Sequence, residues 1–570
     1  MRKRTYVLII FLIFFVLILA TILSFIYFEF GKPPSVRARS YLEIPLSGEI
    51  QEKAPDNFLV TLISGKPALS MYDIWVNIQK AKIDNRIQSL VIRLGYLNCD
   101  WGKINELREI ILDFKTSGKK VYAYIEETFE FDKEYYLATA CDSIILHPLG
   151  TLVINGIGGY IPFFKNSLDK LGIEAEIEHV EEFKTAFNMF TEEGFTPAHK
   201  LMIESLYENL FSKYLETISQ TRGKTEKEAR ALIDHGFFQG DRAREAGLVD
   251  DLLFEDEFEN LIRERGEKTY KISHAQYNKI KPSSLGLNRG KKIALIYGMG
   301  TILTGESSAN TMGSKTVARW IKRAREDKSI TAIVFRVDSP GGSAVASDII
   351  WREIILAKKE KPVVISMSGV AGSGGYWVSM AAHKIVAHPQ TLTGSIGVVF
   401  GKFNFKDLSD KLGITTEKLI YGNRADMFST FKKLTPEERA FLKKEILWSY
   451  DQFLTRVAEG RKMTKEAVDN IAKGRVWSGS QAQELGLVDE LGGLSKAIEL
   501  AKELAGIPYD EGVKFVVWPK KVSLLSTITG KKQARESFVF EPKLEKVLFV
   551  LKALSKERIW ALMPFWIAPQ

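Results

Sequence analysis

The chain has 570 residues, of which 45% are hydrophobic and 26% are charged. This composition excludes a disordered or fibrous protein, and the length is sufficient for two or more domains that each bury a core. The formal net charge of +9 is small for this length. It predicts mild affinity for anionic lipid and no binding of nucleic acid.

Cysteine and histidine are too few and too scattered to predict a metal site. The chain contains two cysteines, Cys99 and Cys141, and seven histidines without an HExxH pair. Zinc sites need several such ligands at close and regular spacing, and two cysteines provide no disulfide framework. We therefore expect no metal, and we expect both cysteines to be small core residues.

The first 31 residues predict a membrane anchor. A basic cluster, Arg2-Lys3-Arg4, precedes an uncharged apolar run from Thr5 to Phe28, which is long enough to cross a bilayer as a helix. The basic end should stay in the cytoplasm, with the rest of the chain across the membrane. A cleaved signal peptide is the competing interpretation, but the run is long for one and no clear A-x-A site follows.

The remainder contains an internal repeat with a period of about 240 residues. Lys-Leu-Gly-Ile at 170–173 recurs at 411–414, and Thr196-Pro197 and Thr435-Pro436 each precede a long helical pattern. A repeat of this length is a duplicated domain, because solenoid units are far shorter. The predicted divisions are a first copy over 40–262, a linker over 263–291, a second copy over 292–508, and a tail of unreadable role over 509–570.

Within each copy, short runs rich in β-branched residues alternate with helical segments. In the second copy, strands are predicted at 293–297, 332–337 and 362–366, with helices around 317–326 and 346–358. This alternation is typical of βαβ units, so the predicted fold class is α/β with a largely parallel sheet.

Two glycine-rich loops follow predicted strands of the second copy. Asp338-Ser-Pro-Gly-Gly342 follows one strand, and Ala371-Gly-Ser-Gly-Gly375 follows the next and begins a helix. Open α/β sheets place their sites at the carboxyl ends of strands. Glycines there let backbone N–H groups approach a ligand, and such donors suit a tetrahedral oxyanion.

Ser373, inside the second loop, is the candidate nucleophile. Its hydroxyl could attack a carbonyl group while the N–H of Gly374 and that of Gly341 or Gly342 hold the oxyanion. The alternative without chemistry is a Gly-Ser turn before a helix, which explains most Ser-Gly-Gly strings.

A serine nucleophile needs a base, and the nearest histidines in sequence are His383 and His388. His388 precedes a proline, as does its counterpart His147 in the copy that lacks the serine. This correspondence indicates a structural role in a His-Pro turn. A Ser-Lys pair is the remaining option, provided that burial keeps the lysine neutral.

Comparison of the two copies identifies Lys184 as the candidate base. Where the second copy has Ser373-Gly-Gly375, the first has Asp132-Lys-Glu134. In the reverse direction, Lys184 of the first copy aligns with Asn423 of the second. These complementary losses predict one composite site, assembled from two half-degenerate domains.

Two alternatives concern this lysine. A lysine beside Glu181 and Glu182 is normally solvated, although the flanking Phe183 and Phe187 favour partial burial. A string of the S-x-x-K type also occurs at 167–170. It fits an exposed helical turn outside the glycine loops, so we discard it.

These motifs resemble the family of signal peptide peptidase A, also called protease IV, in its long tandem-domain form. The strings that carry the resemblance are Ala371-Gly-Ser-Gly-Gly-Tyr-Trp377, Phe183-Lys-Thr-Ala186 and Thr393-Gly-Ser-Ile-Gly397. The resemblance implies two Clp-protease/crotonase-like domains, each a spiral of βαβ units, with Ser395 hydrogen-bonded to the lysine amine. One string departs from the family pattern. Residues 183–188 read Phe-Lys-Thr-Ala-Phe-Asn, where many relatives have Tyr-Lys-Ser-Ala followed by an acidic residue and proline. This departure weakens the transfer of the family's substrate preference to this chain.

The resemblance further implies a membrane-anchored serine endopeptidase that degrades cleaved signal peptides and other apolar peptides through an acyl-enzyme, without metal or organic cofactor. It implies a homotetramer in a bacterial inner membrane, with its N-terminus in the cytoplasm and its catalytic domains on the periplasmic or outer side. Two rivals remain, a crotonase-like acyl-CoA hydratase or isomerase and a catalytically dead membrane scaffold. Whether Ser373 and Lys184 meet within one chain also stays open, although the duplication favours it.

Overall fold

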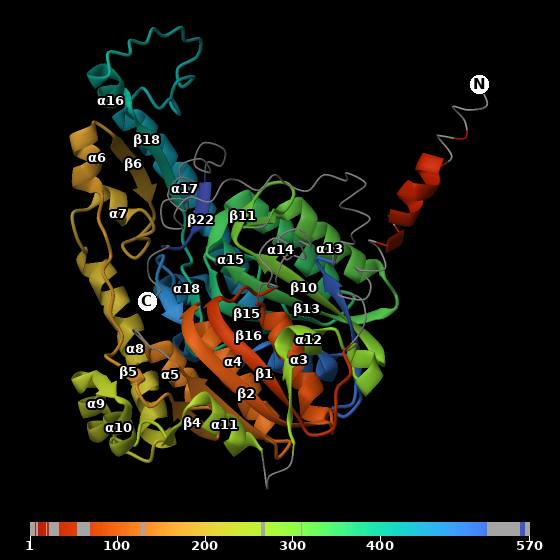
Figure 1. Ribbon diagram of the computed structural model, residues 1–570. Helices are drawn as coiled ribbons and strands as arrows, with labels where there is room; N and C mark the ends of the chain where they lie inside the picture. Colours follow the sequence, from red (N-terminus) through yellow and green to blue (C-terminus); the bar gives the residue numbers. More distant parts are fainter. Residues whose placement is uncertain are drawn as a thin grey trace.

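The computed structural model describes residues 34–53, 69–126, 131–263, 268–308, 310–520 and 559–564, and near the N-terminus residues 6, 10–18 and 20–21. The predicted anchor between Thr5 and Phe28 therefore lies largely outside the described residues. Among those that are described, no helix is both long enough and apolar enough to cross a membrane. Residues 10–18 are helical, and they stand apart from the body of the protein in Figure 1.

The first copy is built on a six-stranded sheet in the order β8-β4-β3-β2-β1-β9, and every pairing in it is parallel. Residues in the middle of β2 are buried on both faces of the sheet, as expected for parallel strands covered by helices. The strands of this copy's sheets are β1 (Ser40–Glu49), β2 (Ile87–Asn98), β3 (Lys120–Ile125), β4 (Ser143–Leu146), β8 (Asp251–Leu252) and β9 (Tyr270–Ser273), with a separate pair β5 (Thr151–Val153) and β7 (Phe237–Gln239).

The second copy has an eight-stranded sheet whose main path is β19-β17-β15-β13-β10-β21, with β16 and β20 beside it. The pairings are parallel except that of β17 with β19, which confirms the predicted βαβ arrangement. The strands are β10 (Lys291–Met299), β13 (Ile330–Ser339), β15 (Val363–Gly372), β16 (Lys384–Ala387), β17 (Leu392–Gly394), β19 (Val476–Ser478), β20 (Glu490–Leu491) and β21 (Val513–Trp518).

Helices cover the sheets and recur between the copies. Thr196 caps α8 and Thr435 caps α17, each followed by proline at the start of the helix, which confirms the two predicted long helices. The helices are α3 (Met71–Ile83), α4 (Trp101–Lys115), α5 (Asp132–Ala138), α6 (Lys165–Leu171), α7 (Asn188–Thr191), α8 (Pro197–Thr221), α9 (Glu226–His235), α10 (Gly240–Glu245), α11 (Glu255–Ile262), α12 (His274–Asn278), η3 (Pro282–Leu285), α13 (Ser314–Glu326), α14 (Ala344–Lys358), α15 (Gly374–Trp377), α16 (Lys406–Lys411), α17 (Pro436–Arg461), α18 (Lys465–Ile471), α19 (Gly479–Glu484) and α20 (Leu494–Leu504).

A third sheet joins the two copies, in the order β12-β11-β14-β22-β18-β6. Its strand β6 comes from the first copy and pairs antiparallel with β18 of the second, side by side in Figure 1. Its strand β22 comes from the C-terminal tail. The strands are β6 (Glu174–His179), β11 (Thr301–Leu303), β12 (Thr311–Gly313), β14 (Gly341–Ser343), β18 (Val399–Asn404) and β22 (Ile559–Leu562).

Helices and strands occur in two segments for which the sequence predicted no secondary structure. The expected linker contains β9 and α12, and β9 is the edge strand of the first sheet. The expected tail contributes β21 to the second sheet and β22 to the third. β9 beside β1 and β21 beside β10 hold the same edge position in the two sheets, so the duplication extends into both segments, although the sequence comparison did not reveal it.

A buried ionic network connects the two copies at β13. The Arg336 guanidinium on β13 contacts the carboxylates of Glu52 and Glu106, both from the first copy, and all three side chains are buried. Burial by itself would raise the pKa of Glu106, but Arg336 and other neighbours lower it to about 2. Lys103 on α4 is 2.8 Å from Asp338, at the start of the first glycine loop.

We predict that Arg336→Met destabilises the protein by about 3–5 kcal/mol, because it leaves two buried carboxylates without their counter-charge. Urea unfolding of the full chain measures this difference. The control is Lys406→Met, which removes an exposed ion pair with Asp410 and should leave the midpoint almost unchanged. Equal stability of Arg336→Met and the unmodified protein would contradict a structural role for the network.

Candidate active site

Ser373 lies at a sharp turn between β15 and α15. Its backbone has φ of 53° and ψ of −110°, a left-handed conformation that is strained for a residue with a side chain. Two hydrogen bonds hold the turn, from Ser373 N to the Gly394 oxygen at 2.7 Å and from Trp377 N to the Ser373 oxygen at 2.8 Å. A strained turn from strand to helix presents a nucleophile at the end of a sheet in other hydrolases.

Lys184 reaches Ser373 from the first copy. Its Nζ lies 2.8 Å from Ser373 Oγ, and 3.0 Å from both the hydroxyl and the carbonyl oxygen of Ser395. The lysine is 1% exposed and the serine 0%. Burial lowers the pKa of the Lys184 amine well below its ordinary value, because desolvation penalises the charged form. An uncharged amine in contact with a hydroxyl is able to accept its proton.

The loop that carries Lys184 fits against glycines of the second copy. Gly474 has φ of 80°, and a Cβ on it would run into the backbone and Cβ of Lys184. A Cβ on Gly397 would lie 3.2 Å from the Lys184 side chain. The loop is tied further by the Phe183 N–H, which donates to the Lys473 oxygen at 3.2 Å. The sequence analysis did not single out Gly474, because its importance is apparent only from its contact with Lys184 of the other copy.

The glycines predicted to bind an oxyanion lie beside Ser373. Gly341 has φ of 101° and Gly342 φ of 155°, so a side chain at either position would be strained. A Cβ on Gly341 would lie 2.7 Å from the amide nitrogen of Gly374. The structure therefore brings both predicted loops together with the lysine and Ser395.

The other candidates lie elsewhere. His388 is buried 3.7 Å from carboxylate oxygens of Glu106 and Glu109, and His383 Nδ1 accepts the Val363 N–H at 3.0 Å. These contacts fit the structural role predicted for His388. The string at 167–170 is on α6, with its serine and lysine exposed.

In the first copy, carboxyl groups occupy the place that corresponds to the serine turn. Asp132 Oδ1 accepts the Tyr214 hydroxyl at 2.6 Å and the Gly156 N–H at 3.1 Å. Glu134 is buried and accepts the Leu97 N–H. Burial raises the pKa of Asp132 to about 6 and that of Glu134 to about 7. This half of the duplication therefore holds no nucleophile at that turn.

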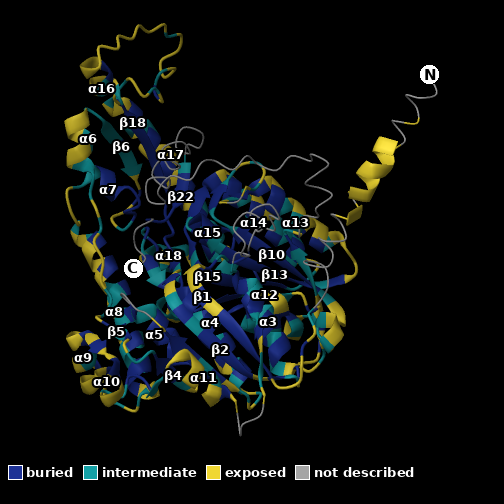
Figure 2. Cartoon of the chain, viewed as in Figure 1, coloured by how far each residue is buried: buried dark blue, intermediate teal, exposed yellow. Residues whose placement is uncertain are grey.

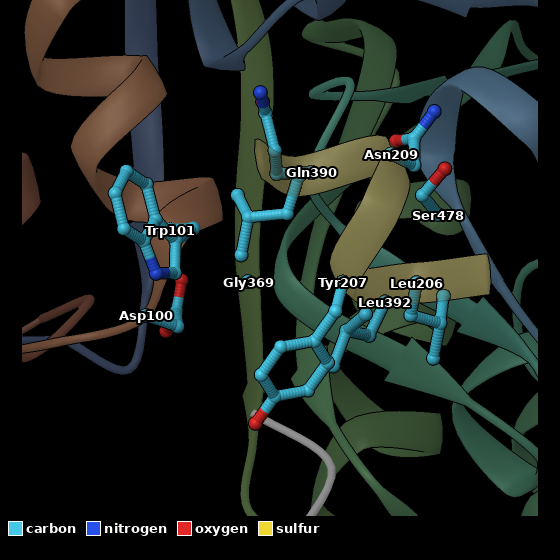
Figure 3. A pocket seen from close by; sticks show the side chains of 10 residues that line it. Asp100, Trp101, Leu206, Tyr207, Asn209, Gly369, Gln390, Leu392 and Ser478 are labelled. Carbon is cyan, nitrogen blue, oxygen red and sulfur yellow. The ribbon is translucent and has the colours of Figure 1, made fainter. Parts of the chain in front are cut away.

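A small cavity lies between the two copies, where it is lined by Gly369 of β15 (Figure 3). It measures about 30 Å³. Neither Ser373 nor Lys184 lines it. The lining residues come from α4, α8 and the strands around β15: Asp100, Trp101, Leu206, Tyr207, Asn209, Leu210, Gly369, Gln390, Leu392 and Ser478.

Comparison with known proteins gives a consistent result. Residues 113–268 and 355–508 both match peptidase family S49. A protein named "Serine protease SPPA, chloroplastic" from Arabidopsis thaliana is 35% identical, over 84% of this chain and 71% of the relative. "Protease 4" of Salmonella typhi is 34% identical, over 83% of this chain and 80% of the relative.

Among solved structures, a ClpP1 mutant from Listeria monocytogenes is similar to 36% of this chain and covers 94% of its own, with 15% sequence identity and a TM-score of 0.24. A similarity of this size is too weak to establish the fold. The Clp-protease/crotonase type stays a prediction, whereas the duplication and the α/β sheets are observed directly.

Proposed function

The chain belongs to peptidase family S49 and is a serine protease, and we propose that Ser373 is its nucleophile and Lys184 its general base. The observation that carries this proposal is the 2.8 Å approach of a buried lysine amine to a serine hydroxyl on a strained turn. The two groups come from different copies of one duplicated chain, so a single chain is sufficient for the dyad.

In the proposed mechanism, neutral Lys184 accepts the hydroxyl proton as Ser373 Oγ attacks the carbonyl carbon of the substrate. The N–H of Gly374 and that of Gly341 or Gly342 stabilise the oxyanion. Lysine then donates the proton to the leaving amine, and the C–N bond breaks. A water molecule, activated by the same lysine, attacks the acyl-enzyme and releases the acid.

Ser395 has a positioning role in this proposal. Its hydroxyl and carbonyl oxygens both lie 3.0 Å from Lys184 Nζ. A residue with φ of 49° is unusual outside glycine, and the Ser395 N–H is held by the Arg475 oxygen at 2.7 Å. These contacts orient the amine lone pair towards Ser373.

We also propose the finer features that the family resemblance implies. These are a retained anchor within residues 5–28, an orientation with the catalytic domains outside the cytoplasm of a bacterial cell, a homotetramer, and signal peptides and other apolar peptides as substrates. The described residues 10–18 support the anchor, because their large apolar side chains are 44–70% exposed. Family membership argues against the acyl-CoA enzyme and the dead scaffold.

Ser373→Ala and Lys184→Met should each lower kcat/KM for an apolar peptide ester by at least about 10³-fold, because each removes one half of the dyad. A serine-reactive phosphonate should label the unmodified full chain and not Ser373→Ala. Lys170→Ala is the matched control and should keep full activity, since this lysine is exposed on α6. Activity retained in Lys184→Met would mean that the base lies elsewhere.

The pH profile should report the lowered pKa of Lys184. The protonated amine cannot act as a base, so kcat/KM for an uncharged ester should fall about tenfold per pH unit below that pKa. Above it, the profile should be flat well before pH reaches about 10.4, the ordinary pKa of lysine. A rate that climbs steadily up to that pH would show that the amine is not desolvated.

Gly474→Ala should lower kcat/KM by about tenfold or more, because the added methyl group pushes the Lys184 backbone away from Ser373. The comparison variant is Gly194→Ala, where a Cβ meets no atom within 4 Å. Both variants should keep their unfolding midpoint within a few degrees. An unchanged kcat/KM in folded Gly474→Ala would exclude this glycine as a support for the lysine.

A further inference from the structure

The side chain of Arg475 contacts an aromatic ring from each copy. Its guanidinium carbon lies 4.1 Å from the centre of the Trp477 ring and 5.1 Å from the centre of the Phe183 ring. Trp477 belongs to β19 of the second copy, whereas Phe183 directly precedes Lys184 in the first. The indole is itself held in place, because Trp477 Nε1 donates to the Ile471 oxygen at 2.9 Å. One cation therefore joins the lysine loop to a fixed ring of the second copy.

This guanidinium has no acidic partner within the part of the chain that the structure describes. Its Nε has no hydrogen-bond partner there. Burial lowers the pKa of the Arg475 side chain, whereas a carboxylate beside it would raise that pKa. Arginine still carries its charge at neutral pH. A partly buried cation needs compensating contacts, and the faces of Trp477 and Phe183 provide them.

The main chain at Arg475 contacts the other residue that holds the lysine amine. The Ser395 N–H donates to the Arg475 oxygen at 2.7 Å, and both Ser395 oxygens lie 3.0 Å from Lys184 Nζ. One residue earlier, the Gly474 N–H donates to the Ile396 oxygen at 2.8 Å. Arg475 is therefore joined to Ser395 through its backbone and to the lysine loop through its side chain.

The arginine belongs to the copy that carries the serine turn. β19 pairs antiparallel with β17, and β7 of the first copy pairs antiparallel with β5. β19 and β7 each lead directly into a short helix, α19 or α10, so the two strands correspond. Arg475 directly precedes β19, whereas Gly236 directly precedes β7. An arginine that only stabilised the repeated fold would be expected in both copies, so its occurrence in one favours a role at the dyad.

Few main-chain hydrogen bonds hold the lysine loop against the second copy. The Phe183 N–H donates to the Lys473 oxygen at 3.2 Å, and the Val180 N–H donates to the Val398 oxygen at 3.3 Å. Both bonds are long, so side-chain contacts must contribute to holding this loop. If Phe183 moved away from the second copy, water would reach the amine of Lys184. Because burial is what lowers the pKa of this amine, hydration would raise it again.

We propose that Arg475 is a positioning residue for the dyad: its guanidinium, stacked on Trp477 and Phe183, holds the lysine loop of the first copy against the serine turn of the second. This inference rests on the proposed function and adds a residue that acts through Lys184.

Replacement of the cation tests this role. Arg475→Met keeps a long apolar side chain and removes the planar cation. In the full chain, kcat for an apolar peptide ester should fall about tenfold while KM changes less than about twofold, because the base is misplaced and the substrate contacts are not. The acid limb of the kcat/KM profile should also move to higher pH, because a hydrated amine binds its proton more tightly. An unchanged kcat, or a lower kcat with an unshifted profile, would overturn the proposal.

Two further variants separate the cation from general packing. Arg475→Lys should lie between Arg475→Met and the unmodified chain in both readouts, because an ammonium group still contacts one ring but cannot stack on two. The matched control is Arg230→Met, which removes a guanidinium 4.8 Å from the Phe211 ring. Arg230 lies on α9, at an exposed edge of the molecule in Figure 2, so neither kcat nor the pH profile should change.

A double-mutant cycle tests whether the cation acts through the ring beside the lysine. Phe183→Leu alone should shift the pH profile in the same direction as Arg475→Met, and an unshifted profile would overturn the proposal even if Arg475→Met did not fold. When the two changes are combined, kcat should be within about twofold of the slower single variant, because both remove one contact. Losses that multiply would show that the two residues act independently.

The same measurements separate this inference from the proposed function. If the unmodified chain and Arg230→Met both fail to hydrolyse the ester and to react with a serine phosphonate, the proposed function itself fails. If both react and Arg475→Met matches them in kcat and in pH profile, only the positioning role fails.

Discussion

The two copies of this protein meet at one interaction, the contact at 2.8 Å between the buried amine of Lys184 and the hydroxyl of Ser373. In water the amine of Lys184 would hold its proton, whereas burial in this structure lowers its pKa well below the ordinary value, as the proposed role of a base requires. A lysine from the same copy as the serine turn would need other residues to exclude water from its amine. Here, a loop of the first copy delivers the lysine, and the second copy encloses it with Gly397 and Gly474.

Two sets of contacts between the copies fix the position of the loop that carries Lys184. The pairing of β6 with β18 fixes the strand from which the lysine loop leaves, over residues 174–179 and 399–404. Deeper in the molecule, Arg336 meets two carboxylates from the other copy, which ties the sheets at the level of the first glycine loop. In the proposed dyad each copy supplies one group, and the first copy carries Asp132 and Glu134 at the turn where the second copy has the serine.

Burial of the base and access of a substrate are opposing requirements at this site. Ser373 and Lys184 are almost completely buried, and so are the residues of β22, which pairs with β14 beside the serine turn. In the proposed mechanism a substrate carbonyl must reach the glycine amides while the amine of Lys184 stays desolvated, as preorganised catalysis requires.

The sequence by itself determined the duplication and the βαβ alternation, and it predicted that Ser373 and Lys184 meet, because each of these features leaves a local or repeated signal. Apolar periodicity follows from burial, glycine strings from close backbone approach, and the exchanged serine and lysine from comparison of the copies. Only the tertiary structure decided the features that are set by long-range pairing. β9 and β22 join sheets that are built from distant segments, and Ala561 lies against the glycine loop. Gly474 lies against Lys184, which is 290 residues earlier in the chain. Such contacts depend on which strand edges are left open after folding, and no local pattern of residues records that.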